Sequence, residues 1–179
     1  MTDLETNTMA DAALMLLGPA EVGRAAGQSI GAGASDRIVR SARLRRTVLG
    51  LSKDEVEVVH LDVLRHLAKE DGPEKLCLRA EALLRRSELR RTIVGPLARA
   101  LRDRFGEAVV EWAVSWDGEL ADGYGEGAGL DALHAWMQDA GPACGGLAEI
   151  TIPEGMFDRA ASEAPSAAIA AAVVQSDAT

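Results

Sequence analysis

Hydrophobic positions recur at helical spacing through the centre of the chain. After Ser52, apolar residues fall at i, i+3, i+7, i+8 and i+11, namely at Val56, Val59, Val63, Leu64 and Leu67. Residues at this spacing line one face of an α-helix. Ser52 and Glu55 also match a capping box, in which each side chain meets an unpaired backbone N–H of the first turn. The pattern therefore predicts an amphipathic helix that begins at Ser52.

Further helices are expected between residues 71 and 137. Turn signals separate them: Asp71-Gly72-Pro73, Gly95-Pro96 and Gly106. Their apolar stripes are Leu76, Ala80, Leu83 and Leu84; then Leu97, Leu101 and Phe105; then Val109, Val110, Ala113, Val114 and Trp116; and finally Leu130, Leu133, Trp136 and Met137. The helix from Glu107 is apolar on most sides, which predicts a central place in the core. Whether the first of these helices continues past Ser87 stays open, because Ser87 could also cap a separate segment.

The pattern weakens towards both ends. Residues 1–35 are expected to form a weakly ordered segment with a short helix and a Gly/Ala linker, and residues 161–179 an Ala-rich, weakly ordered tail. Between them, residues 36–160 form the predicted helical domain, with a glycine-rich acidic loop at 117–129 and an extended stretch at 147–152. The expected fold is mainly α: an irregular bundle of about six to eight helices with Gly-rich loops and little or no sheet.

Composition agrees with helices packed on helices. The 179 residues are 47% hydrophobic but only 3% aromatic, so the core must consist mainly of Leu, Val, Ala and Ile. Neither cysteine, Cys77 or Cys144, lies in a CxxC or CxxH pattern, so no disulfide framework, zinc site or cofactor is expected. The N-terminus has the wrong charge for a signal peptide, and no apolar run approaches the ~20 residues of a membrane span. We expect a cytoplasmic protein without direct membrane insertion.

Charge is segregated along the chain. Residues 37–104 hold 17 basic and 10 acidic residues, a net charge of +7, whereas the remainder carries −16. Such a basic centre could attract nucleic acid, acidic lipid or an acidic protein surface. The candidate partner-binding residues are the cluster Arg85, Arg86, Arg90 and Arg91. An acidic protein partner, nucleic acid, and a solvated face with internal salt bridges all remain open as explanations of this cluster.

Catalytic patterns are lacking. His60 and His66 are six residues apart and would point in different directions on a helix, unlike an i, i+4 metal pair. No serine lies in a GxSxG elbow. The glycine-spaced GQSIGAG segment lacks the Gly-Lys-Ser/Thr ending of a phosphate-binding loop. We therefore predict no catalytic, cofactor-binding or metal site, and no enzyme.

The arginine cluster belongs to a longer series of spaced residues. The series comprises Leu83, Leu84, Arg90, Arg91, Ile93, Leu97, Leu101, Phe105, Gly106, Glu107, Val109, Trp112, Ala113 and Val114, followed by Leu133, Trp136, Leu147 and Ile150 to Pro153. Over about residues 59–153 it resembles the type III secretion sorting-platform accessory proteins of the SctK (YscK/OrgA) family. The loop at 117–129 and the N-terminal third do not align with that family.

The resemblance implies a non-enzymatic, mainly helical cytoplasmic adaptor of a secretion apparatus. Its partners would be the cytoplasmic domain of the inner-membrane ring protein and the pod protein, so that it could lie peripherally at the inner membrane. The excess of arginine over lysine would suit an acidic partner surface. The alternative from another class is a small helical nucleic-acid-associated regulator that uses residues 37–104.

Overall fold

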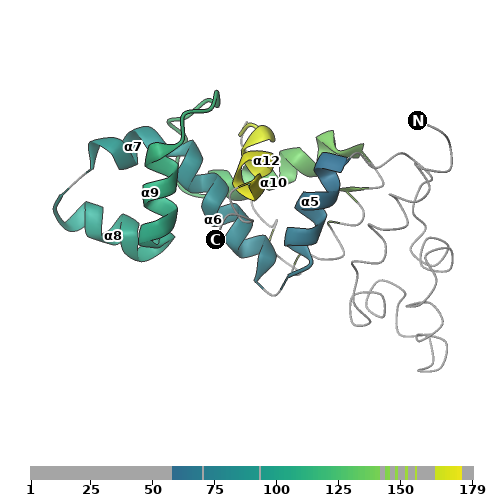
Figure 1. Cartoon of the computed structure of the whole chain (residues 1–179), viewed down its shortest axis with the longest axis horizontal. Coiled ribbons are helices and arrows are strands. Elements are labelled where there is room, and N and C mark those ends of the chain that lie inside the picture. Colours follow the sequence, from purple (N-terminus) through teal and green to yellow (C-terminus); the bar gives the residue numbers. More distant parts are fainter. Residues whose placement is uncertain are drawn as a thin grey trace, which may run out of the picture. The chain divides into compact units, whose positions relative to one another are not determined.

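The computed structural model describes residues 58–69, 71–92, 94–141 and 164–174, together with 144, 145, 148, 152 and 156. Its regular elements are α5 (Val58–Leu67), α6 (Gly72–Leu84), α7 (Arg86–Arg91), α8 (Pro96–Phe105), α9 (Glu107–Ser115), α10 (Ala128–Asp139) and α12 (Ala167–Val174) (Figure 1). The described part of the chain contains helices and no strand, which confirms the mainly α fold. The expected N-terminal segment and the capping box at Ser52 lie outside the described residues.

The chain divides into two compact units. The first comprises residues 1–73 and 137–156, and the second comprises residues 74–136 and 157–179. These units do not coincide with the three segments expected from the sequence. Each unit therefore combines stretches that are far apart along the chain.

In the first unit, α5 buries the last three residues of the predicted stripe. Val63, Leu64 and Leu67 are buried, and α5 ends at Leu67, shortly before the predicted turn at residues 71–73. In the stretch expected to be extended, Ala148 is helical and the Ile152 N–H donates to its carbonyl over 3.0 Å. That i, i+4 bond is the repeat of an α-helix, so the extended interpretation was wrong at this point.

In the second unit, α6 and α10 pack closely. The predicted stripe of α6 is buried throughout, as are Leu133 and Trp136 of α10. A Cβ at Gly129 would lie 1.9 Å from the carbonyl oxygen of Cys77, so only glycine permits this approach. The glycine that the sequence assigned to a loop is thus a contact point between two helices.

The helix that begins at Gly72 ends at Leu84, and a separate short helix follows. Arg85 occupies the position before α7, with no side-chain cap, so Ser87 does not play the capping role considered for it. Gly95 adopts φ 102° and ψ −176° immediately before Pro96, the first residue of α8. This backbone conformation is open essentially to glycine alone, which explains the sharp break between α7 and α8.

Helix α8 turns a different face inwards from the one predicted. Its buried residues are Ala98, Leu101 and Phe105, whereas Leu97 is 53% exposed. The expected stripe was therefore wrong at Leu97, because small Ala98 completes an i, i+3, i+7 face that excludes it. Gly106 ends the helix as predicted, with φ 82°.

Helix α9 is less buried than its apolar sequence predicted. It packs against both α7 and α8. Trp112 and Ala113 are buried, but Val109, Val110 and Val114 are only half-buried. The expectation of a central core helix was wrong, since the valines leave a partly uncovered apolar face.

The C-terminal segment is also more ordered than expected. Helix α12 buries Ala168, Ile169, Ala172 and Val173. Alanine has the highest helix propensity, and its small side chain allows close packing. The interpretation of this part of the tail as weakly ordered was therefore wrong.

Candidate functional site

The four arginines of the predicted partner-binding cluster lie on the α6–α7 segment of the second unit. The side chains of Arg85 and Arg86 are only 12% and 11% exposed, respectively. Arg90 and Arg91 are exposed. The structure thus separates the cluster into an inner and an outer pair.

Arg85 is held by carboxylates of its own helical segment. It pairs with Glu88 over 2.8 Å and with Glu81 over 3.1 Å, and its guanidinium lies 5.8 Å from the centre of the Phe105 ring. The hydrogen bond to Glu88 raises the pKa of Arg85, and burial opposes this shift. These contacts hold the end of α6 against α8 and leave the Arg85 charge paired within the chain.

Glu81 is the buried centre of this network. Its carboxylate accepts hydrogen bonds from Arg85, from Arg104 at 2.9 and 3.1 Å, and from the Gly127 N–H at 3.1 Å. Arg104 also pairs with Glu126. One carboxylate therefore joins α6, α8 and the start of α10, and both of its cationic partners are shared with a second acid.

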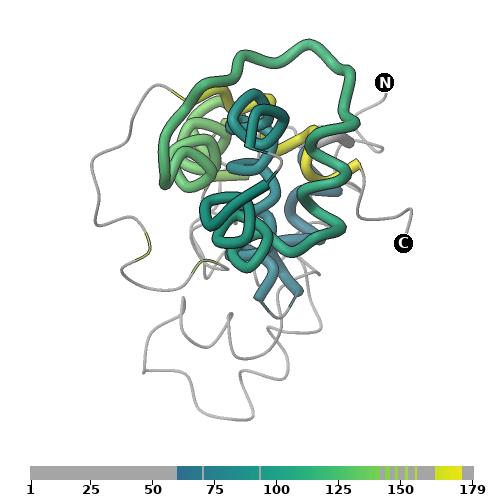
Figure 2. The backbone as a smooth tube through the Cα atoms, turned by 90° about the vertical axis from the view of Figure 1, so that its left-hand side faces the viewer, coloured from purple at the N-terminus to yellow at the C-terminus, as the bar shows by residue number. Residues whose placement is uncertain are grey.

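Arg86 fastens the glycine-rich acidic loop to α7. It donates to the Leu120 carbonyl, lies 3.5 Å from the Asp122 carboxylate and stacks 5.2 Å from the centre of the Trp116 ring. The Ser87 hydroxyl donates to the same Asp122 carboxylate over 2.6 Å. The loop arches from α9 to α10 (Figure 2). These side-chain contacts tie it to α7.

Backbone contacts complete this attachment. The N–H groups of Gly123 and Tyr124 donate to the Leu84 carbonyl over 2.9 and 3.2 Å. Leu84 is the last residue of α6, and the last carbonyls of a helix have no partner within it. The loop therefore caps α6, a role that its composition did not indicate.

The outer arginines also contact backbone carbonyls. Arg90 donates to the carbonyls of Val114 and Trp116, each over 2.9 Å, and so caps the end of α9. Arg91 donates to the Ser87 carbonyl, four residues earlier, over 3.1 Å. Cations suit helix C-termini because of the partial negative charge there. Both side chains still face solvent, and a guanidinium has five donors, so Arg90 retains N–H groups for another partner.

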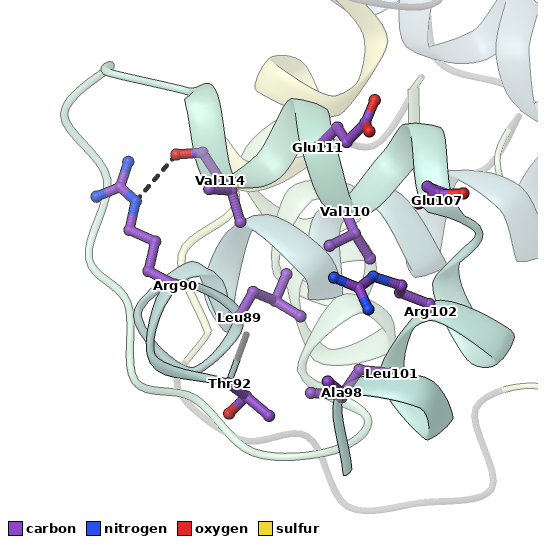
Figure 3. A pocket seen from close by; sticks show the side chains of 10 residues that line it. All are labelled: Leu89, Arg90, Thr92, Ala98, Leu101, Arg102, Glu107, Val110, Glu111 and Val114. Atoms are coloured by element: carbon purple, nitrogen blue, oxygen red, sulfur yellow. Dashed lines mark hydrogen bonds between the residues drawn. The ribbon is translucent and has the colours of Figure 1, made fainter. Parts of the chain in front are cut away.

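A groove lies between α7, α8 and α9, with a volume of about 260 Å³. Its lining residues are Leu89, Arg90, Thr92, Ala98, Leu101, Arg102, Glu107, Val110, Glu111 and Val114. Leu89, Leu101 and Val110 approach one another in its interior (Figure 3). Four of the lining residues are charged, and Figure 3 draws the Arg102 guanidinium between Val110 and Leu101, so the lining combines apolar and charged side chains.

Exposed apolar residues occur next to this groove, at the start of α8 and just before it. Val94, in the connection between α7 and α8, is 84% exposed, and Leu97, the second residue of α8, is 53% exposed. This surface was not predicted from the sequence, because Leu97 was assigned to the core and all the α9 valines to buried positions. The feature of the sequence that could have indicated this surface is the valine-rich helix with glutamates at positions 107 and 111.

The described residues offer little for covalent or metal chemistry. They contain no group of three His, Cys, Asp or Glu side chains arranged to hold a metal ion. Burial, with the nearby charges of Glu81 and Glu74, raises the pKa of Cys77 to about 12, which keeps its thiol protonated. Both ring nitrogens of His66 are engaged, with the Asp62 carbonyl and the Lys69 amine. None of the helices described is long and apolar enough to cross a membrane.

Comparison with known proteins gives no relative: no family model, curated protein or solved structure matches the chain.

Proposed function

We propose that the chain is a non-enzymatic adaptor of a bacterial type III secretion sorting platform, which links the inner-membrane ring protein to the pod protein. The observation that carries the adaptor role is the apolar groove of α7–α9 beside the exposed Val94 and Leu97. Exposed apolar surface with a polar rim is typical of protein-binding sites. The choice of partners comes from the sequence resemblance.

The size of the groove supports a protein partner. Its volume of about 260 Å³ is below the roughly 300–1,000 Å³ of most small-molecule sites. A cavity of about 150 Å³ holds a benzene ring, so this groove has room for one or two large side chains. Anchoring side chains of this kind provide most of the affinity in many protein complexes.

The arginine contacts weigh against the nucleic-acid alternative. Arg85 and Arg86 are mostly buried, and each is paired with carboxylates of the chain. Phosphate binding requires accessible cations whose charge is not already neutralised. A gel shift with duplex DNA and single-stranded RNA at low salt tests this alternative, and salt-dependent binding there would favour it.

Complex formation tests the adaptor proposal. The full chain is co-expressed with the ring protein's cytoplasmic domain and the pod protein of the same bacterium, and complexes are analysed by size-exclusion chromatography. We expect the chain to co-elute with at least one of them. If the chain keeps its helical circular dichroism spectrum but binds neither protein, the proposal is wrong.

Surface variants show whether the exposed apolar residues contribute. Val94→Ser combined with Leu97→Ser should weaken the complex at least about tenfold, which corresponds to ~1.4 kcal/mol of lost contact. Because both side chains are exposed, the fold should not change. Ala100→Ser, at another exposed position of α8, is the matched control and should bind like the wild type.

A further inference from the structure

The groove between α7, α8 and α9 is lined by residues of these three helices and of the connection after α7. Its described walls are helices, which present no strand edge to an incoming chain. An extended peptide would therefore bring N–H and C=O groups into an apolar groove without partners, which is unfavourable. A helix satisfies those groups internally, and helix-in-groove docking is a common mode of peptide recognition.

Charge on the two sides of the groove differs in sign. On α9, Glu107 and Glu111 are four residues apart and therefore lie on one helical face. The facing helices contribute Arg90 and Arg102 to the lining. A complementary helix would carry basic residues along the edge above α9 and acidic residues along the other edge, because like charges placed together suppress binding.

Arg90 fixes the basic side in place. Its guanidinium donates to the Val114 and Trp116 carbonyls, and Figure 3 shows the side chain reaching from α7 to the end of α9. The positive charge at this end of the groove is therefore held by the fold before any partner arrives. Preorganisation of this kind reduces the entropy lost on binding.

We propose that the α7–α9 groove binds an amphipathic helix of a partner protein. The helix would insert two apolar side chains into the groove, with lysine or arginine on its α9 edge and aspartate or glutamate on its α7–α8 edge. This inference deepens the proposed adaptor function, since it assigns the groove to partner binding. The inference concerns the chemistry of the bound helix and does not require the partner to be a secretion protein.

A displayed library of helical peptides tests the proposal. The peptides have about four turns, or about 14 residues, with the outward face fixed and the other positions randomised. The library is selected against the full chain. We expect enriched clones to have apolar residues at i, i+3 or i+4, and i+7, with acids along one flank and bases along the other. Enrichment of extended, Pro-rich or uniformly charged peptides would overturn the proposal.

Two neighbouring valines give a matched pair of variants. Val110 lines the groove and Val109 does not, although both are half-buried residues of α9. Val110→Glu should weaken binding of the best synthetic peptide at least about tenfold by fluorescence anisotropy, because it places a charge among the apolar lining residues. Val109→Glu should change the affinity by less than about twofold. Equal effects of the two substitutions would overturn the assignment.

A pair of substitutions at exposed positions tests the role of charge without disturbing buried side chains. Glu107→Lys with Glu111→Lys changes only exposed side chains. This variant should bind the selected peptide several-fold more weakly, and should bind a peptide with glutamates on both flanks more tightly than the wild type does. Unchanged affinity for both peptides would show that the charges do not select the occupant.

Separate outcomes distinguish this inference from the proposed function. If the chain binds a ring or pod protein and Val110→Glu leaves that complex intact, the adaptor role stands and the groove assignment is wrong. If helical peptides compete for the groove but neither secretion protein binds, the groove stands and the secretion role is wrong. Sedimentation that shows dimers of the chain, abolished by Val110→Glu, would instead assign the groove to a second copy and overturn the proposal.

Discussion

Replacing the carboxylate of Glu81 by an amide should destabilise the second unit strongly. The side chain is only 5% exposed and accepts hydrogen bonds from Arg85, Arg104 and the Gly127 N–H. Glu81→Gln keeps the size of the side chain but removes its charge. It also places an NH₂ group where one oxygen accepted two donors, Arg104 and Gly127. Donors would then face donors in a buried place.

The expected magnitude follows from what each partner retains. Removing one member of a buried ion pair costs about 3–5 kcal/mol, because an uncompensated charge remains. Arg85 keeps Glu88 at 2.8 Å, and Arg104 keeps its ion pair with Glu126. Since neither arginine is left without a carboxylate partner, the lower end of this range applies. We expect Glu81→Gln to reduce the free energy of unfolding by about 3 kcal/mol.

Glu88→Gln is the matched control. It removes a carboxylate from the same arginine, Arg85, but the Glu88 side chain is 35% exposed and makes a single contact with it. Partly exposed pairs of this kind contribute about 0.2–1 kcal/mol. The two substitutions have the same chemistry, so their difference isolates the effect of the buried network.

Tryptophan fluorescence during urea unfolding measures this difference. All three tryptophans of the chain, Trp112, Trp116 and Trp136, belong to the second unit, so the signal reports on that unit. A free-energy loss for Glu81→Gln that is no larger than that for Glu88→Gln would refute the reasoning. It would mean that Glu81 does not hold the three elements together.

Three further substitutions test other parts of the second unit. Arg86→Ala should cost about 2–3 kcal/mol, because it removes several charge-assisted contacts to the acidic loop, whereas Arg91→Ala should cost less than about 0.5 kcal/mol. Urea unfolding compares the stabilities of the two variants. Hydrogen exchange at the amides of the acidic loop should be faster in Arg86→Ala than in the wild type, and unchanged in Arg91→Ala. Equal exchange rates in the two variants would contradict the attachment of the loop by Arg86. Gly95→Ala should reduce the free energy of unfolding by about 1–3 kcal/mol, because Gly95 has a backbone conformation that alanine adopts only with strain. Gly125 has no positive φ and open space around the position of a Cβ, so Gly125→Ala should have little effect on the melting temperature. Burial raises the pKa of Cys77 from 9.0 to about 12, so the stability that its protonated thiol provides is complete below about pH 9 and is lost as the pH rises to about 12. Cys77→Ala should therefore flatten the decline in stability over that interval, and an unchanged slope would show that another group causes it.

Helix ends were the most predictable feature of the fold. Glycine and proline restrict the backbone locally, so the break at Gly95-Pro96 and the stop at Gly106 follow from residue type alone. The stripes of α5 and α6 were equally clear, because large aliphatic residues alternate with charged ones at helical spacing.

The phase of a helix was less predictable where apolar residues allow two choices. In α8, Leu97, Leu101 and Phe105 follow an i, i+4 series, but Ala98, Leu101 and Phe105 form an equally good face. The larger side chain suggested the first choice, whereas the structure buries the small alanine. Only the neighbouring helices determine which face fits, and their packing is not encoded in the local pattern.

The role of the arginines could not be read from the sequence for a related reason. Arg86 donates to a carbonyl 34 positions later, and Arg90 donates to carbonyls 24 and 26 positions later. Every residue has a carbonyl, so these acceptors leave no mark in composition or spacing. The open alternative of internal contacts was the closest that sequence reasoning came to this arrangement.

The arginine contacts change how partner recognition by this chain should be understood. A cluster of free cations would attract any acidic surface, and its binding would fall steeply with salt. Here Arg85 and Arg86 are neutralised internally, and Arg90 is held in position by the end of α9. Specificity in our proposal therefore comes from the shape of the apolar groove and from a few charges fixed around it. Binding through such a surface should depend less on ionic strength than binding by an exposed basic face.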